Sequence, residues 1–223
     1  MTFDQAEYDL RCEWGMAGLA ALAPVSDVVI IVDVLRFSSA VDVALAQGAS
    51  VEPRRWNAAR DAGHSPLSPA RLQGLAAGSE LVMPSPNGST LAANAGASVT
   101  FTACLRNCRA VAERAREFGS RIAVIPAGER WPDGALRPAI EDLLGAAAVL
   151  TALRGRPSPE VQAATAIFER FRGDLREVLM QCGSGRELIE RGLARDVEIA
   201  AEYDVSGVAP ILRDGRFIDL SAR

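Results

Sequence analysis

The sequence predicts an α/β protein, a three-layer α/β/α fold with a largely parallel or mixed central sheet. Residues 27–34, DVVIIVDV, form a continuous β-branched run, which is typical of a strand covered on both faces. Strand-like and helix-like segments then alternate along most of the chain. Near the end, Asp214-Gly215 lies between two short apolar runs and predicts a hairpin.

The first half of the chain contains the expected central strand, residues 27–34. Ser38 as a cap and an apolar stripe that stops at Gly48 predict a helix, and residues 49–53 predict the next strand. We therefore expect one βαβ unit here. Residues 54–78 are polar and interrupted by Gly and Pro, so we expect an irregular segment with one short helix beginning at Ser68-Pro69.

The second half continues the alternation, and the segments carry recognisable start and stop residues. Strands are expected at residues 80–83, 98–101 and 121–128. Helices are expected at residues 87–96, 105–119, 138–153, 157–180 (one or two helices) and 184–204, the last with a break at Gly192. Residues 208–212 and 216–220 should pair as the final hairpin. Because 223 residues suit one core and no linker is visible, we expect a single domain over residues 1–223.

Composition excludes several kinds of partner. A net charge of −4 provides no broad basic surface, so we expect no nucleic-acid partner. No stretch reaches the roughly 20 apolar residues that a membrane span requires, and the first residues contain no apolar leader segment. We therefore expect a cytoplasmic protein that does not enter a membrane. The four cysteines form no C-x-x-C pair and are expected to be free thiols.

The basic residues exclude several kinds of chemistry. All 24 are arginine, which removes a P-loop lysine and Schiff-base catalysis. The single histidine, His64, cannot build a zinc site with several histidines, and a Ser-His-Asp triad would depend on it alone. The groups that remain available for catalysis are carboxylates, arginines, hydroxyls, backbone amides and a metal ion.

The first candidate site follows the central strand. Asp33 ends an apolar strand, where ligands bind in open α/β sheets, and a carboxylate there can hold a hard cation. Arg36 can bind phosphate or sulfonate oxygens, and Ser38 and Ser39 begin a helix whose amino end favours an anion. The alternative is an aspartate that caps its own loop, a surface arginine and an ordinary serine cap.

Three other segments carry candidate residues. Asn87, Gly88 and Ser89 form a turn into a helix that can cradle a phosphate, although an ordinary turn has the same composition. Glu141 and Asp142 are adjacent carboxylates on an apolar helix. Because neighbouring helical residues point about 100° apart, we expect one to bind a metal ion and the other to support it; stabilisation of the helix dipole is the alternative. The fourth segment, between Cys104 and Cys108, offers Arg106 and Asn107 as ligand contacts, with the two cysteines as core residues.

Taken together, these segments resemble the 2-phosphosulfolactate phosphatase family. They occur in that family's order and cover most of residues 10–212: VDVLRFSSAVDVALAQGA, LSP, PNGSTLAANA, CLRNCRAVA, IPAGERW, IEDLLGAA and GRELIERGLARDVEIAAEYDVSGVAPIL. The resemblance implies a three-layer α/β fold and Mg²⁺-dependent hydrolysis of (2R)-phospho-3-sulfolactate on a route to coenzyme M. It implies functional roles for Asp33, Arg36, Ser68, Asn87, Gly88, Ser89, Asn107, Gly128, Glu141 and Asp142. Leu67, Phe37 and Ser89 depart from the family pattern, which leaves the substrate more open than the fold.

The resulting hypothesis is a magnesium-dependent phosphatase of a small anionic phosphorylated substrate. Asp33, Arg36 and Glu141 are expected to be catalytic, and Mg²⁺ to be held by Asp33 with Glu141 or Asp142. Two alternatives stay open: a binder of phosphate or sulfonate that has lost the activity, and a phosphatase of the haloacid-dehalogenase type. The latter class has a second Asp where Leu35 stands, and a lysine that this chain lacks. A homodimer is an open possibility for the assembly.

Overall fold

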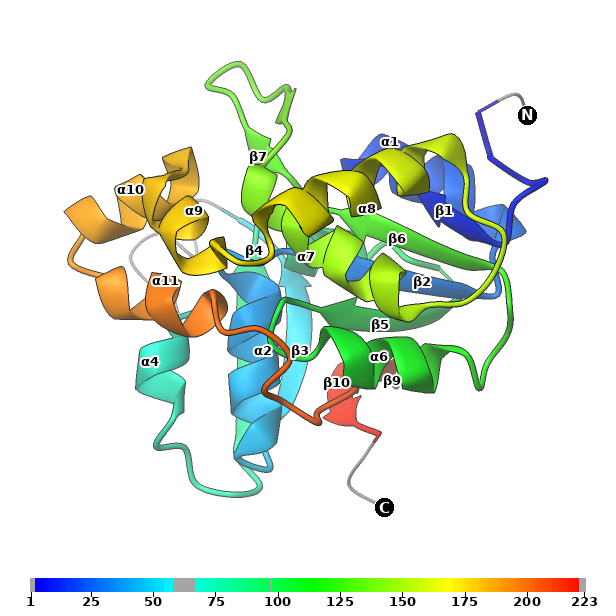
Figure 1. The fold of residues 1–223 in the computed structure, drawn as a ribbon. Coiled ribbons are helices and arrows are strands. Elements are labelled where there is room, and N and C mark those ends of the chain that lie inside the picture. Colours follow the sequence, from blue (N-terminus) through cyan, green and yellow to red (C-terminus); the bar gives the residue numbers. More distant parts are fainter. Residues whose placement is uncertain (1–2, 58–66, 97, 221–223) are drawn as a thin grey trace.

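The chain folds around an eight-stranded sheet with helices on both faces (Figure 1). The computed structural model describes residues 3–57, 67–96 and 98–220, so His64 lies outside the described residues. In order across the sheet, the strands are β1 (Leu10–Cys12), β6 (Ile122–Pro126), β2 (Val28–Val32), β5 (Val99–Ala103), β9 (Pro210–Arg213), β10 (Arg216–Asp219), β3 (Ser50–Arg55) and β4 (Glu80–Ser85). A separate small hairpin pairs β7 (Glu129–Arg130) with β8 (Leu136–Arg137).

The sheet is mixed. Strands β1, β6, β2 and β5 are parallel, and the predicted C-terminal hairpin, β9–β10, continues the sheet in antiparallel fashion. Strand β3 pairs antiparallel with β10 and parallel with β4. The expectation of a βαβ unit was therefore wrong: β3 is neither next to β2 nor parallel to it, because the hairpin is inserted between β5 and β3 and reverses the chain direction.

Strand β2 lies at the centre of the protein, as the continuous apolar run predicts. All five of its residues are completely buried. Val28, Ile30 and Val32 face one hydrophobic core, whereas Val29 and Ile31 face a second core on the other side of the sheet. Alternate side chains of a strand point to opposite faces, so this division shows that both faces of β2 are covered. The predicted three-layer fold with a mixed sheet is confirmed.

The helices divide between the two cores. The first core receives α6 (Cys108–Ala115), α7 (Ile140–Ala152), α8 (Pro159–Phe171), α9 (Leu175–Gln181), α10 (Gly183–Glu190) and most of α11 (Ala194–Ala200). The second receives α1 (Gly15–Leu22), α2 (Phe37–Ala46), α4 (Pro69–Leu72) and α5 (Gly88–Ala92), with the short 3-10 helix η1 (Ala23–Val25) after α1. Strand β1 and helix α1 are elements that the sequence analysis did not anticipate.

Two further expectations can be compared with the structure. All four cysteines are free thiols, as predicted. In the parts of the chain that the structure describes, none of the helices has the length and apolar character needed to cross a membrane.

Candidate active site

Asp33 stands directly after β2, and its carboxylate is fixed by the backbone around it. Oδ2 accepts a hydrogen bond from Gly88 N at 2.8 Å and lies 3.4 Å from Ser85 Oγ, while Oδ1 accepts from Phe37 N at 3.2 Å. Burial raises the pKa of Asp33, and the bonds from Gly88 and Phe37 oppose that rise. The hydrogen bonds therefore fix the Asp33 carboxyl group in a position that solvent hardly reaches.

Asp142 joins two loops at the same edge of the sheet. Its Oδ1 accepts a hydrogen bond from Val34 N at 2.7 Å, and its Oδ2 accepts from Gly128 N at 2.8 Å. These amides follow β2 and β6, so one side chain from α7 fixes both strand ends. Burial, with the negative charges of Asp33 and Glu141, raises the pKa of Asp142 well above its usual value.

Glu141, the neighbour of Asp142, is differently placed. Its side chain is 2% exposed, and its Oε2 is a buried atom with no hydrogen-bond partner among the described residues. The negative charge of Glu141 also contributes, as the smallest of the causes, to the raised pKa of Asp33. A buried carboxylate oxygen without a donor is costly unless a cation or water completes it.

These oxygen donors suit a hard divalent cation. Within residues 3–57, 67–96 and 98–220, no three His, Cys, Asp or Glu side chains form a ready-made metal site. Mg²⁺, however, is commonly bound through one or two carboxylates, with water and substrate phosphate completing its coordination. The unpartnered oxygen of Glu141 fits that requirement. Both Asp33 and Asp142 accept amide hydrogen bonds at each oxygen, but Asp33 lines the cavity described below and Asp142 does not, which makes Asp33 the better second ligand.

Glu129 is a site residue that the sequence analysis missed. Glu129 comes soon after the carboxyl end of β6, and Asp33 comes directly after that of β2. The Oε2 atom of Glu129 accepts a hydrogen bond from Asn87 Nδ2 at 2.9 Å. Burial, and then the charge of Asp33, raises the pKa of Glu129 to about 7. The signal was present in the sequence, because a carboxylate soon after a second apolar parallel strand belongs at the same sheet edge, but only Gly128 of this segment was predicted as a site residue.

The raised pKa of Glu129 predicts how stability depends on pH. A carboxyl that binds its proton more tightly in the folded state stabilises the protein fully below its unfolded pKa, near 4.5, and less as the pH rises towards 7. Relative to the Glu129→Gln variant, the free energy of unfolding of the metal-free wild type should fall by up to about 3 kcal/mol between these pH values. Urea unfolding in EDTA at pH 4.5 and pH 8 measures the difference, and a difference that does not change with pH would contradict the prediction.

Arg36 is held at the site by a buried ion pair. Its Nη1 lies 2.8 Å from Asp196 Oδ2, and both side chains are almost fully buried. The other oxygen of Asp196 accepts from Ser68 Oγ at 2.7 Å and from Ala70 N at 3.0 Å. Ser68 therefore contacts the acid that positions Arg36, and α11, which carries Asp196, is part of the site.

A cavity of about 210 Å³ opens where these segments meet. Of the predicted site residues, Asp33, Arg36 and Asn87 line it. Residues that were not predicted line it too: Ser85, Glu129, Ser184, Glu187 and Arg191 are among them. The cavity thus combines carboxylates, arginines and hydroxyls within the volume of a small metabolite.

The hydroxyls after Asp33 are occupied within the fold. Ser38 Oγ accepts from Asp33 N at 2.9 Å and lies 2.7 Å from Thr102 Oγ1, and Ser39 Oγ donates to Val34 O at 2.8 Å. Both serines are completely buried, and neither lines the cavity. They shape the turn that presents Asp33 and Arg36, and a direct contact with substrate stays a prediction.

The residues at the start of α5 also form hydrogen bonds within the fold. Asn87 N donates to Ser85 Oγ at 3.1 Å, Gly88 N donates to Asp33, and Ser89 Oγ lies 2.7 Å from Met83 O. The Asn87 and Gly88 amides that the sequence suggested for a phosphate therefore already serve the site's own side chains. In the structure these two amides orient Ser85 and Asp33.

Arg106 and Asn107 lie in a separate network. Arg106 pairs with Asp42, with its Nε 2.7 Å from Oδ2, and with Glu202. Asn107 Oδ1 accepts from Cys104 N at 2.9 Å and so closes its own turn. Neither residue lines the cavity, and their contacts join α2 and α6 to the segment after α11. Both residues are therefore engaged within the fold, and their contact with substrate stays a prediction.

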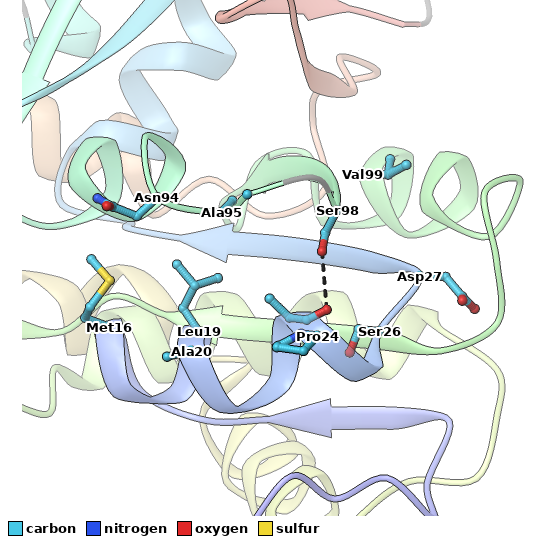
Figure 2. A pocket seen from close by; sticks show the side chains of 12 residues that line it. Met16, Leu19, Ala20, Pro24, Ser26, Asp27, Asn94, Ala95, Ser98 and Val99 are labelled. Atoms are coloured by element: carbon cyan, nitrogen blue, oxygen red, sulfur yellow. Dashed lines mark hydrogen bonds between the residues drawn. The ribbon is translucent and has the colours of Figure 1, made fainter.

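A larger hollow, about 590 Å³, lies at the opposite edge of the sheet (Figure 2). Its walls include Asp27 and Val99, at the amino ends of β2 and β5, and the apolar residues Leu19 and Ala20 of α1. Ser98 Oγ there donates to Ala23 O at 3.3 Å. This hollow is larger than the 210 Å³ cavity, but Asp33, Glu129 and the buried Arg36 line the smaller cavity, at the carboxyl ends of β2 and β6.

Comparison with known proteins agrees with the resemblance seen in the sequence. A family model described as 2-phosphosulpholactate phosphatase matches residues 58–215. The 2-phosphosulfolactate phosphatase of Methanothermobacter thermautotrophicus is 31% identical over 62% of this chain and 58% of its own length. Probable 2-phosphosulfolactate phosphatases of Pseudothermotoga lettingae and Gloeobacter violaceus are 24% and 29% identical, over 87% and 82% of this chain and 94% and 87% of their own lengths. This chain belongs to the 2-phosphosulfolactate phosphatase family.

Proposed function

We propose that the protein is a Mg²⁺-dependent phosphatase that hydrolyses a small phosphomonoester, with (2R)-phospho-3-sulfolactate as the expected substrate. The observation that carries the proposal is the pair of buried carboxylates, Asp33 and Glu141, with one unpartnered oxygen, beside a cavity that Asp33 and Arg36 line. The family membership and the names of the relatives supply the substrate class.

The residues that would hold Mg²⁺ are Asp33 and Glu141. When bound, the ion would draw charge from the phosphoryl oxygens and so make phosphorus easier to attack. Asp142 keeps the Val34 and Gly128 amides in place, so that the two loops carrying Asp33 and Glu129 stay aligned. This proposed division of work follows the expectation that one of the two adjacent acids ligates the ion and the other supports it.

The chain's own residues bind and orient the phosphoryl group. Arg36 supplies a fixed positive charge at the cavity wall, because Asp196 prevents its side chain from swinging away. Ser85 Oγ, beside Asp33, is a hydroxyl within the same cavity. In the net reaction, an oxygen from water replaces the alcohol oxygen at phosphorus, and the departing alkoxide takes up a proton. Most of the rate gain would come from positioning and charge neutralisation.

Phosphate release measures this activity. We expect turnover of small phosphorylated acids in Mg²⁺, loss of turnover in EDTA, and recovery when Mg²⁺ is added in excess. The screen should compare sulfonated and carboxylated phosphomonoesters directly. Turnover that EDTA leaves unchanged would contradict the metal dependence. Tight binding of these compounds without hydrolysis would favour the alternative, a binding protein that has lost the activity.

A further inference from the structure

Helix α10 forms one wall of the site cavity. Ser184, Glu187, Leu188 and Arg191, the last just after the helix, line that wall. Their spacing places them on a single face of the helix. The expected family chemistry gave none of these positions a role, although together they supply much of the cavity's surface on this side.

The cavity has a buried floor and an exposed rim. Asp33, Arg36, Ser85 and Ser184 are each less than a tenth exposed and belong to the floor. Arg191, by contrast, has 55% of its side chain exposed and therefore belongs to the rim. A phosphoryl group at the floor, near Asp33 and Arg36, would direct the rest of a small substrate towards Arg191.

The ion pair that Arg191 makes is weak. Its Nη1 lies 3.3 Å from Oε1 of Glu187, which is even more exposed, and a solvated pair of this kind contributes little to stability. A guanidinium forms stronger, two-pronged bonds with carboxylate or sulfonate oxygens. Arg191 can therefore exchange Glu187 for an anionic group of the ligand at little cost.

We propose that Arg191 is a specificity residue that binds the second anionic group, a carboxylate or sulfonate, of a phosphomonoester whose phosphoryl group occupies the floor of the cavity. This inference rests on the proposed function and deepens it. Glu187 competes with the ligand for Arg191 and repels the ligand's second charge, so the two residues should act on affinity in opposite directions.

Three compounds test the proposal: two charged ones, each compared with the same uncharged parent, isopropyl phosphate. In 2-phospholactate a carboxylate stands where isopropyl phosphate has a methyl group, and 1-sulfopropan-2-yl phosphate adds the sulfonate. Arg191→Ala should lower kcat/KM for the two charged compounds roughly five- to tenfold and change the value for isopropyl phosphate less than about twofold. Glu187→Gln should raise kcat/KM for the charged compounds about two- to threefold. The larger effect of Arg191→Ala on one charged compound would identify which anion it prefers.

Arg195→Ala is the matched control, because Arg195 is similarly exposed and pairs with Glu198 on α11, outside the cavity lining. It should leave all three values unchanged. Where a compound is bound but not hydrolysed, its Kd from calorimetry in Mg²⁺ replaces kcat/KM. Charge discrimination that depends on Arg191 without hydrolysis would support this inference and contradict the phosphatase proposal. An equal loss for charged and uncharged compounds, or no binding of any of them, would overturn the inference.

Discussion

Replacing Asp33 with asparagine is expected to reduce turnover at least about 10³-fold while the protein stays folded. The change removes the negative charge at the end of β2, where the proposed cation and the reacting phosphoryl group meet. The asparagine NH2 group can no longer accept from one of the two amides, of Phe37 or Gly88, but the variant no longer buries a charge. Burial of the charge raises the pKa of Asp33, so the two effects oppose each other and the net loss of stability should stay below about 2 kcal/mol. Steady-state kinetics in Mg²⁺ and urea unfolding measure the two effects separately.

The same strand provides the control. Asp27 precedes β2 as Asp33 follows it, and its carboxylate pairs with Arg121, with Oδ1 2.6 Å from Nη2, at the edge of the sheet away from the site. Asp27→Asn should cost at most about 1 kcal/mol of stability and leave kcat/KM within about twofold. Undiminished turnover in Asp33→Asn would refute the assignment of Asp33, and equal losses in both variants would point to a structural cause.

The fold was predictable where local pattern decides structure. The apolar run of β2 predicts burial on both faces, and Asp214-Gly215 predicts the hairpin of β9 and β10. The direction of β3 was not predictable, because it depends on a hairpin formed by residues more than 150 positions later in the chain. Strand β1 has three residues and includes Arg11, so it offers too little apolar pattern to be recognised.

Some residues of the candidate site were predictable from the sequence, and others were not. Asp33, Glu141 and Asp142 stand out because strand ends and helix periodicity are visible in the sequence, and the different contacts of the two adjacent acids agree with their different directions on α7. The pair of Arg36 with Asp196 spans 160 residues, and no local pattern on α11 marks it. Long-range partners of this kind are chosen by packing and become visible only when the elements are assembled.

A methyl group at Gly88 is expected to disable the site by steric contact alone. A Cβ there would lie 2.7 Å from Asp33 Cβ, 2.8 Å from Asp33 Oδ2 and 2.7 Å from Phe37 Cδ1, all well inside van der Waals contact. Phe37 is fully buried and packs edge-on against Phe217, so it has little room to move. Gly88→Ala should therefore push α5 away from Asp33 and break the bond from Gly88 N, which lowers kcat/KM more than about 10²-fold.

The Gly88→Ala effect can be separated from a general cost of overpacking. Overpacking should cost about 1–3 kcal/mol, a loss that most folded domains survive. Gly74→Ala is the control, because nothing lies within 4 Å of the added methyl there, and it should be neutral or slightly stabilising with full activity. If Gly88→Ala stays folded in urea titrations and keeps wild-type kcat/KM, the close approach of α5 to Asp33 is not needed for catalysis. If activity falls while Phe37 and β2 stay packed, the backbone amide of Gly88 is what keeps the catalytic carboxylate in place.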